Sequence, residues 1–334
     1  MKILYLSCHS INEYEDIKMF SELGHEIVSQ GAYNNPEKPG DNMRPPLHGI
    51  YYNPEMAELA KTLYWDYTTT SIIPKKLIEW CDIIYILGIH QWLLTNWDRI
   101  KHKKVVFRSI GQSIPSTEQI LAKFRREGLK IVRYSPVERR IPGYCGEDAL
   151  IRFYKDEDEY KDWNGKISRV ITVAQNMKNR GWCLHYDIFE KATRGLPRTL
   201  YGKQNENAGK LFGGCLNYEE LKQAYRDNRV FFYTGTHPAP YTMAFQEAFM
   251  TGTPIVSIGK QLAGWDLEIP EIIENGVHGF WSDSIRELHE YTKLLLEDYN
   301  LAKKISENAR KKAIELFSKH KIREQWKNFF DQLA

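Results

Sequence analysis

The chain has 334 residues, of which 42% are hydrophobic and 27% charged, and its formal net charge is +3. This length favours two domains, and the composition is ordinary for a soluble globular protein. Five well-separated cysteines without a Cys-x-x-Cys pair argue against a disulfide framework and a structural zinc site, and they favour a reducing compartment.

The first half of the chain alternates short apolar runs with helical patterns. Because strand, helix and strand follow one another with short connections, we expect a parallel sheet covered by helices on both faces. Strands are predicted at KILYLS, HEIV, CDIIYILGI, KKVVFRSIG and LKIVRYS, helices at YEDIKMFSEL, WLLTNWDRI and TEQILAKFRREG, and a loop at GAYNNPEKPGDNMRPPLHG.

The same alternation restarts after a polar break at residues 156–166. We therefore predict one domain over 1–165, a second over 166–317 and a final helix over 318–334. Strands of the second half are predicted at RVITVAQ, RTLYG, VFFYTGT and TPIVSIG, with helices near YDIFEKAT, at YEELKQAYRD and along the tail from Ser284.

The stretch YTMAFQEAFMTGTPIVSIG, from Tyr241, predicts a helix, a glycine stop and a strand. Pro240 suits the position just ahead of the helix, and Gly252 ends it. Because the helix follows a strand directly, its free N–H groups and its positive dipole end form an anion site. Glu247 lies in its second turn, where it either accepts hydrogen bonds from a sugar diol or is an ordinary surface glutamate.

The segment 99–140 carries 12 Lys and Arg against 3 Glu, a local charge of +9. This segment either serves an anionic partner, such as DNA or a membrane surface, or is simply a solvated surface. No run approaches the roughly 18 apolar residues of a transmembrane helix, and the N-terminus reads as a buried strand. A cytoplasmic location is therefore expected, with peripheral membrane association left open.

Several segments of the second half match a known family in the right order. QEAFMTGTPIVS is similar to its LEAMACGTPVV signature, VAQNMKNRG falls at its Gly-Arg…Lys-Gly loop, and IIENGVHGFWSD is similar to its dGvnGll turn. On these motifs the chain resembles the retaining GT-B glycosyltransferases, especially glycosyltransferase family 4 (glycosyl transferases group 1). The resemblance implies a GT-B fold, in which two Rossmann-like, doubly wound α/β domains face each other across a cleft.

The resemblance also implies a site for a nucleotide sugar in the second domain. Glu247 matches the second Glu of the family's E-x7-E motif, which binds the nucleotide ribose. The segment Tyr241, Thr242 and Met243 occupies positions whose backbone amides meet the diphosphate and the sugar. Arg180 matches the cation that stabilises the diphosphate, and the remaining donor-binding candidates are Gln175, Lys178, Gly202, Thr236 and His237.

Two positions depart from the family pattern. The first Glu of E-x7-E, which holds donor-sugar hydroxyls, is replaced by Ala239. The Arg of the family's Arg-x4-Lys pair is replaced by Gln175, so Arg180 keeps only one of the two charges. Lys178 is a candidate for the missing cation, although a solvated lysine is the simpler interpretation.

In the first half, candidates are the polar side chains that follow predicted strands, since ligands of open parallel sheets bind at the carboxyl ends of the strands. A loop or capping role is the alternative for each of the two histidines. The catalytic candidates are His9, His90 and Arg108, and the acceptor-side candidates are Ser109, Gly111 and Gln112.

Taken with these residues, the resemblance implies a hexosyltransferase that uses a nucleotide-diphosphate sugar, with UDP-glucose or a similar donor expected. The first domain would bind the acceptor, and the helix 318–334 would cross back to that domain. No cofactor or metal is expected, because no cluster of side chains has metal-ligand spacing. The acceptor is a saccharide, a lipid-linked sugar or modified DNA. Two alternatives stay open: a nucleotide-sugar epimerase of GT-B fold and an inactive nucleotide-sugar-binding protein.

Overall fold

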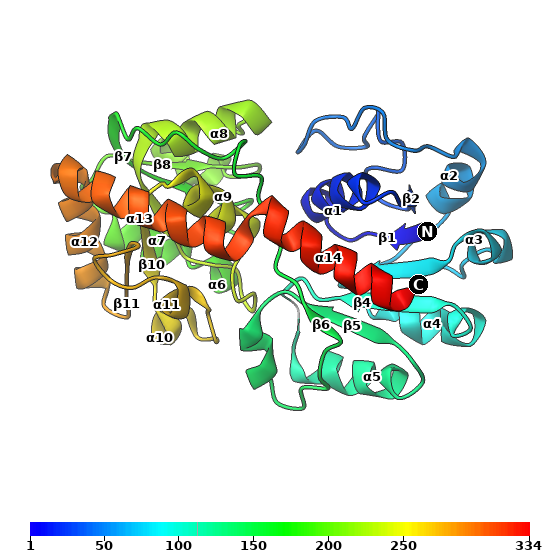
Figure 1. The fold of residues 1–334 in the computed structure, drawn as a ribbon. Helices are drawn as coiled ribbons and strands as arrows, with labels where there is room; N and C mark the ends of the chain where they lie inside the picture. The colour runs from blue at the N-terminus through cyan, green and yellow to red at the C-terminus, as the bar shows by residue number, and fades with distance from the viewer. Residues whose placement is uncertain (112) are drawn as a thin grey trace. The chain divides into compact units, whose positions relative to one another are not determined.

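The computed structural model describes residues 1–111 and 113–334. The chain forms two compact units, one made of Met1–Phe153 with His320–Ala334 and one made of Tyr154–Lys319 (Figure 1). We call these unit 1 and unit 2 and describe each by itself. The domain boundaries that we predict at residues 165 and 317 concern which segments fold independently, and they stay a prediction.

Unit 1 contains a six-stranded parallel sheet in the order β2-β1-β3-β4-β5-β6. Its inner strand β3 is fully buried, as expected for a parallel sheet covered on both faces. The strands are β1 (Lys2–Leu6), β2 (Glu26–Ser29), β3 (Ile83–Leu87), β4 (Lys104–Arg108), β5 (Lys130–Arg133) and β6 (Ala149–Leu150).

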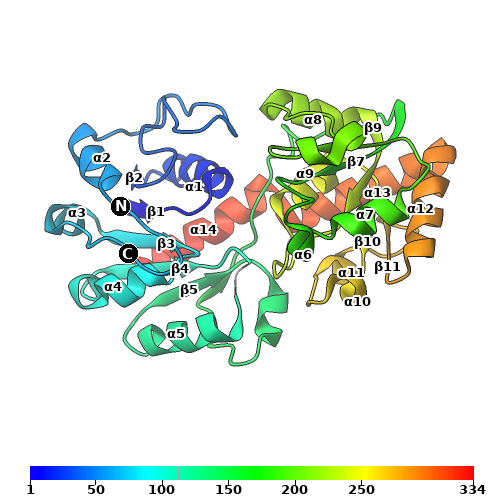
Figure 2. The same cartoon turned by 180° about the vertical axis from the view of Figure 1, so that it is seen from behind.

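Successive side chains of these strands point to opposite faces of the sheet and therefore pack in two different cores. Leu4 and Ile84 belong to a large apolar cluster with residues of four helices, α2 to α5. Tyr5 and Tyr85 stack on the other face, where Tyr85 meets the Phe20 ring of α1. The helices of unit 1 are α1 (Ser10–Glu22), α2 (Pro54–Lys61), α3 (Lys75–Trp80), α4 (Gln91–Ile100), α5 (Pro115–Arg125), the 3₁₀ turn η1 (Pro136–Arg140) and α14 (Lys319–Leu333), seen from behind in Figure 2.

The terminal helix α14 completes the tyrosine-lined face of unit 1. Trp326 and Phe330 of this helix are both 1% exposed and pack edge-on against Phe20. The guanidinium of Arg108 lies 4.7 Å from the Trp326 ring and 4.2 Å from the ring of Phe153. Residues from both ends of the chain therefore share one core.

Unit 2 contains a five-stranded parallel sheet in the order β11-β10-β9-β7-β8. Its strands are β7 (Ile167–Val173), β8 (Arg198–Tyr201), β9 (Asn228–Tyr233), β10 (Ile255–Ile258) and β11 (Phe280–Ser282). Its helices are α6 (Gly181–Leu184), α7 (Tyr186–Ala192), the 3₁₀ turn η2 (Glu206–Leu211), α8 (Tyr218–Asp227), α9 (Met243–Thr251), α10 (Lys260–Ala263), α11 (Ile269–Ile272), α12 (Ile285–Glu297) and α13 (Tyr299–Phe317).

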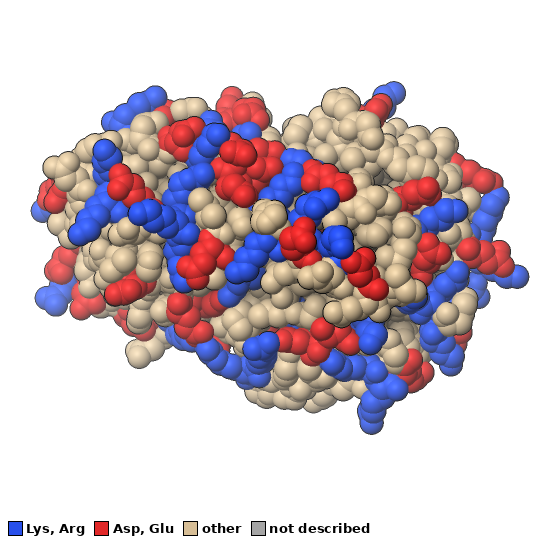
Figure 3. Space-filling view, in the orientation of Figure 1, with Lys and Arg blue, Asp and Glu red and all other residues tan. Residues whose placement is uncertain are grey.

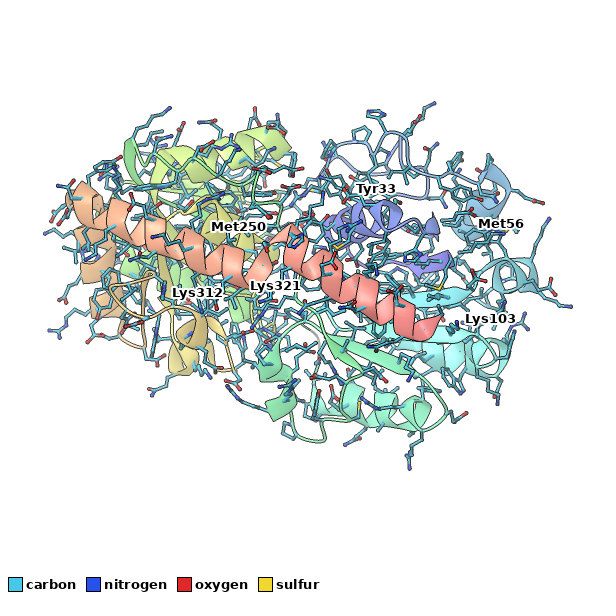
Figure 4. All side chains as sticks on the ribbon, viewed as in Figure 1. Tyr33, Met56, Lys103, Met250, Lys312 and Lys321 are labelled. Atoms are coloured by element: carbon cyan, nitrogen blue, oxygen red, sulfur yellow. The ribbon has the colours of Figure 1, made fainter. Side chains whose placement is uncertain are left out.

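The helix α9 is fixed at its C-terminal end by α13. Gly252 ends α9 with φ +86°, and a Cβ atom there would come within 2.9 Å of Ser306 Oγ. Only glycine combines this left-handed conformation with so close an approach. Arg310 of α13 donates to the carbonyl oxygen of Met250, in the last turn of α9. Figure 4 labels Met250.

The predicted fold class is confirmed, since each unit holds a parallel sheet flanked by helices. The loop predicted at 31–49 contains no helix or strand. Several short elements were not predicted: the helices α2, α3, α6, α10 and α11, the 3₁₀ turns η1 and η2, and the strands β6 and β11, the last of which lies in the segment predicted as a turn. Their local patterns are too short to give a clear periodicity.

Candidate functional site

The loops that follow the strands of unit 2 gather most of the predicted site residues. In a parallel sheet all carboxyl ends lie at one edge, so the loops after β7, β8 and β9 are neighbours. The predicted residues at this edge are Gln175, Lys178 and Arg180 after β7, Gly202 after β8, and Thr236, His237 and Tyr241 to Met243 between β9 and α9.

The start of α9 offers backbone donors at this edge. The N-cap residue Thr242 has an extended backbone, and its side chain makes no capping hydrogen bond. Tyr241 is 2% exposed and packs edge-on against Phe317, which anchors the chain just before the helix. The first-turn amides are thus not capped by the Thr242 side chain, and they sit at the positive end of the helix dipole.

Glu247 lies inside unit 2 and is not a surface residue. Its side chain is 3% exposed, and its Oε1 lies 3.4 Å from Nζ of Lys155, which is fully buried. Tyr225 of α8 donates its hydroxyl to Oε2 of Glu247 over 3.4 Å. A buried carboxylate is tolerated when a cation and hydrogen bonds balance its charge, and this constellation supplies both.

Lys155 is the member of this constellation that the sequence did not reveal. It stands next to the polar run 156–166 and looks like a solvated linker lysine. In the structure its backbone N–H donates to the carbonyl oxygen of Phe317, which draws the side chain into unit 2. This bond and the pair with Glu247 join residues far apart in the sequence, which a local pattern does not display.

The loop after β7 carries two exposed cations. Arg180 donates from Nη1 to the carbonyl oxygen of Gln175 over 3.3 Å, and Lys178 donates to the carbonyl oxygen of Asn207 over 3.0 Å. Within residues 1–111 and 113–334, neither cation is within ion-pair distance of a carboxylate. Both positive charges are therefore available to an anion at this edge of the sheet.

The β8 loop approaches the β7 loop closely at Gly202. This residue has φ +128°, and a Cβ atom there would lie 2.2 Å from the carbonyl oxygen of Ala174. Asn205 donates from Nδ2 to the same oxygen over 2.7 Å. No other residue fits at Gly202, so this position shapes the site through the backbone rather than through a side chain.

The loop between β9 and α9 is joined to the short helix α6. The His237 amide donates to the carbonyl oxygen of Cys183 over 2.9 Å, and Thr234 Oγ1 donates to that of Leu184 over 2.7 Å. Because α6 starts just after Arg180, these bonds hold the cation-bearing loop beside the segment that leads into α9.

In unit 1, the two predicted histidines follow neighbouring strands. His9, after β1, is exposed and accepts the Asn12 amide on Nδ1 over 3.4 Å as the N-cap of α1. His90, after β3, is the N-cap residue of α4 without a side-chain capping bond, and partial burial lowers its pKa. Gly111, after β4, has φ +97°, and Gln112 lies outside the described residues.

Arg108 and Ser109 point into the core of unit 1. Arg108 is 1% exposed, pairs with Asp16 at 2.8 Å and donates to the Tyr85 hydroxyl at 3.3 Å. Burial raises the pKa of Asp16, and the neighbouring guanidinium opposes that rise. Ser109 donates to the buried carboxylate of Glu138 over 2.9 Å. Both positions support a structural role, and neither side chain joins His9 and His90 at the exposed edge.

The basic segment 99–140 is extensively paired with acids from outside it. Lys101 pairs with Asp98, Lys130 with Asp148 and Arg139 with Glu147. Basic and acidic side chains are interspersed on the face drawn in Figure 3. Acids outside the segment therefore offset part of its local charge of +9.

Residues 1–111 and 113–334 contain neither a candidate metal-binding cluster nor a candidate membrane-spanning helix. No group of three or more His, Cys, Asp or Glu side chains in this part of the chain is placed to hold a metal ion. None of its helices has the length and apolar character needed to cross a bilayer.

Comparison with known proteins gives a family match for part of unit 2. Residues 201–312 match the family model described as Glycosyl transferases group 1. Among curated proteins, none matches the sequence.

Three solved structures resemble the fold over nearly the whole chain. Anabaena HepE in complex with UDP-glucose gives a TM-score of 0.70 at 17% identity, covering 99% of this chain and 100% of that one. Sucrose-phosphate synthase from Thermosynechococcus elongatus gives 0.68 at 13% identity, covering 100% and 99%. A glycosyltransferase from Rickettsia africae gives 0.67 at 14% identity, covering 99% and 98%.

At these identities the structural likeness shows only the fold. The class of enzyme rests on the family match of residues 201–312. The two parallel sheets with their flanking helices are the two Rossmann-like halves of the GT-B fold. The chain therefore has the GT-B fold, and its residues 201–312 match the family model of the glycosyl transferases group 1.

Proposed function

We propose that the protein transfers a sugar from a nucleotide-diphosphate sugar, with UDP-glucose as the first candidate, to an acceptor hydroxyl with retention of anomeric configuration. The observation that carries this proposal is the start of α9, whose first-turn amides are not capped by Thr242 and which is joined through α6 to the loop that bears Arg180. Helix amides and a guanidinium are the groups that best accommodate a diphosphate.

The chemistry explains why these groups matter. Transfer breaks the C–O bond between the sugar and the diphosphate, and negative charge develops on the leaving oxygen. Donors already in place for that charge stabilise the transition state more than the ground state, and each contributes about 3 kcal/mol, or roughly 10²–10³ in rate. The leaving oxygen then accepts the proton of the acceptor hydroxyl on the same face of the sugar.

Glu247 is proposed to hold the ribose one turn deeper in α9. The contact of its Oε2 with the Tyr225 hydroxyl, at 3.4 Å, is long for an O–H···O bond. A carboxylate oxygen has capacity for more than one donor, so a ribose hydroxyl replaces or joins that of Tyr225. Lys155 balances the carboxylate charge during this exchange.

The proposal of a UDP-linked donor is supported by the fold relatives. HepE was crystallised with UDP-glucose, and separately with UDP and glucose. Independence of metal is proposed because Arg180 and the α9 amides supply positive potential at the diphosphate.

The test measures release of nucleoside diphosphate from UDP-glucose, UDP-galactose, UDP-N-acetylglucosamine, GDP-mannose and ADP-glucose. Each donor is offered with mixed saccharides, lipid-linked sugars or hydroxymethylated DNA, with and without EDTA. We expect release that depends on an acceptor and persists in EDTA, and NMR of the product should show the donor's anomeric configuration.

Other results would favour the alternatives. Conversion of the sugar without any acceptor would indicate an epimerase. Tight donor binding without release, with every acceptor class, would indicate an inactive binding protein. Loss of release in EDTA would contradict independence of metal, and an inverted product would contradict retention.

A further inference from the structure

Four aromatic side chains of unit 2 form a continuous series, which we call the ring cluster: His185, Trp265, His237 and Trp182. Trp265 stacks on His185 with ring centroids 5.3 Å apart and an interplanar angle of 15°. His237 meets Trp265 edge-on at 5.3 Å, and Trp182 follows at 6.5 Å from His237. These geometries are those of favourable aromatic pairs.

The ring cluster draws on three loops at the carboxyl edge of the unit 2 sheet. Trp182 lies in α6, after β7; His237 lies between β9 and α9; and Trp265 follows α10, after β10. This is the edge at which α9 begins and Arg180 is exposed. The cluster therefore belongs to the region where a ligand of an open parallel sheet binds.

Backbone contacts hold the inner part of the ring cluster in place. Trp265 donates from Nε1 to the carbonyl oxygen of Ala239 over 2.9 Å. A Cβ atom at Gly235, which has φ +73°, would lie 2.9 Å from Cζ2 of Trp265, so glycine makes room for this ring. His185 Nε2 lies 3.1 Å from the carbonyl oxygen of Ala263. The inner rings are thus positioned before any ligand arrives.

The outer ring is exposed. Trp182 is 76% exposed, although the next two residues of α6, Cys183 and Leu184, are buried. Large apolar side chains are usually buried. An exposed tryptophan ring beside aromatic side chains that are fixed in place is therefore an informative exception. Its flat apolar face fits the C–H face of a sugar ring, and the neighbouring His237 offers ring nitrogens to a sugar hydroxyl.

The position of the ring cluster indicates which end of the donor it meets, namely the sugar. Glu247, proposed for the ribose, faces Tyr225 and Lys155. Trp265 instead contacts the segment before α9, at Ala239. A diphosphate at the start of α9 has its ribose on the Glu247 side, which leaves its sugar toward Ala239.

We propose that Trp182 and His237 bind the sugar ring of the donor, with Trp265 and His185 as positioning residues behind them. This inference rests on the proposed function. Ala239 stands where the family resemblance implies a sugar-binding carboxylate, and the ring cluster takes over that task through stacking and a histidine.

The experiment compares binding of a nucleotide sugar with binding of its nucleoside diphosphate by calorimetry on the full chain. UDP-glucose with UDP, ADP-glucose with ADP, and GDP-mannose with GDP are tested, and the pair that the parent binds most tightly is kept. We expect Trp182→Ala to weaken binding of the nucleotide sugar about tenfold and to change that of the diphosphate less than about twofold. Trp182→Phe should retain most of the affinity, and Leu294→Ala, which shortens a 41% exposed side chain of α12, should change neither.

The outcomes separate this inference from the function on which it rests. Equal weakening of both ligands would place Trp182 on the nucleobase or the diphosphate and overturn the assignment to the sugar. An unchanged Trp182→Ala variant would overturn it as well, while a parent that binds diphosphate and transfers sugar would leave the function standing. A parent that binds none of the six nucleotides would overturn both. Because Trp182 is exposed, a parent-like melting temperature should accompany the variant.

Discussion

The two units place charged side chains at corresponding ends of similar parallel sheets but use them differently. At the end of β4 in unit 1, Arg108 is buried and paired with Asp16, and nearby Arg133 pairs with Glu118 at 2.7 Å with both side chains fully buried. In unit 2, Arg180 and Lys178 are exposed after β7, and each donates to a backbone carbonyl oxygen and not to a carboxylate in the interactions described above. A cation at a strand end thus indicates a ligand site only when a buried carboxylate does not already neutralise its charge.

The largest effect should come from breaking a buried pair of unit 1. Arg108→Met leaves Asp16 without its cation in the core, and we expect the free energy of unfolding to fall by ~3–5 kcal/mol. Urea denaturation followed by circular dichroism measures this change. Arg126→Met, an exposed arginine of the same unit, should alter stability by less than about 0.5 kcal/mol. If Arg108→Met kept full stability but abolished turnover, Arg108 would have the chemical role that the sequence first indicated.

A smaller but purely kinetic effect is expected in unit 2. Arg180→Ala should raise the transfer barrier by about 3 kcal/mol, slowing turnover roughly 10²–10³-fold, because one preplaced donor to the diphosphate is lost. The free energy of unfolding should hardly change, since Arg180 is exposed. Arg194→Ala removes another exposed arginine of unit 2 and serves as the matched control. If Arg180→Ala turned over as fast as the parent, the proposed position of the diphosphate at this loop would be wrong.

The smallest effect on function sharpens the comparison, because Glu247 is both buried and proposed to contact a ligand. Glu247→Gln keeps the shape but removes the charge, and we expect UDP binding to weaken about tenfold, or ~1.4 kcal/mol. The substitution also removes the charge that Glu247 places beside the buried Lys155, so stability should fall. Adding Lys155→Met should recover stability but not UDP affinity, measured by denaturation and calorimetry. Recovery of both, or no loss of affinity at all, would assign Glu247 to the core alone.

Local sequence signals predicted the scaffold of the site well. Apolar runs located β1, β3 and β9, and the Pro240 and Gly252 punctuation located the ends of α9. These features depend on residues close together in the sequence, where periodicity and backbone preferences dominate.

The parts that the sequence did not reveal depend on contacts between distant residues. Lys155 meets Glu247 across 92 positions, and Trp265 reaches Ala239 across 26. The burial of Arg108 depends on Trp326, more than two hundred residues later. Burial and pairing of a charged or aromatic side chain are decided by tertiary packing, which a single sequence does not display.

The position of α14 has a consequence for how the chain is made. Trp326 and Phe330 fill the space over Phe20 and Tyr85, so unit 1 lacks part of its core until the last helix has been synthesised. Unit 2 has all of its strands and helices earlier on the ribosome and is free to fold first. The half that emerges first is therefore the half that finishes last, and during that interval its aromatic face is a natural binding surface for chaperones.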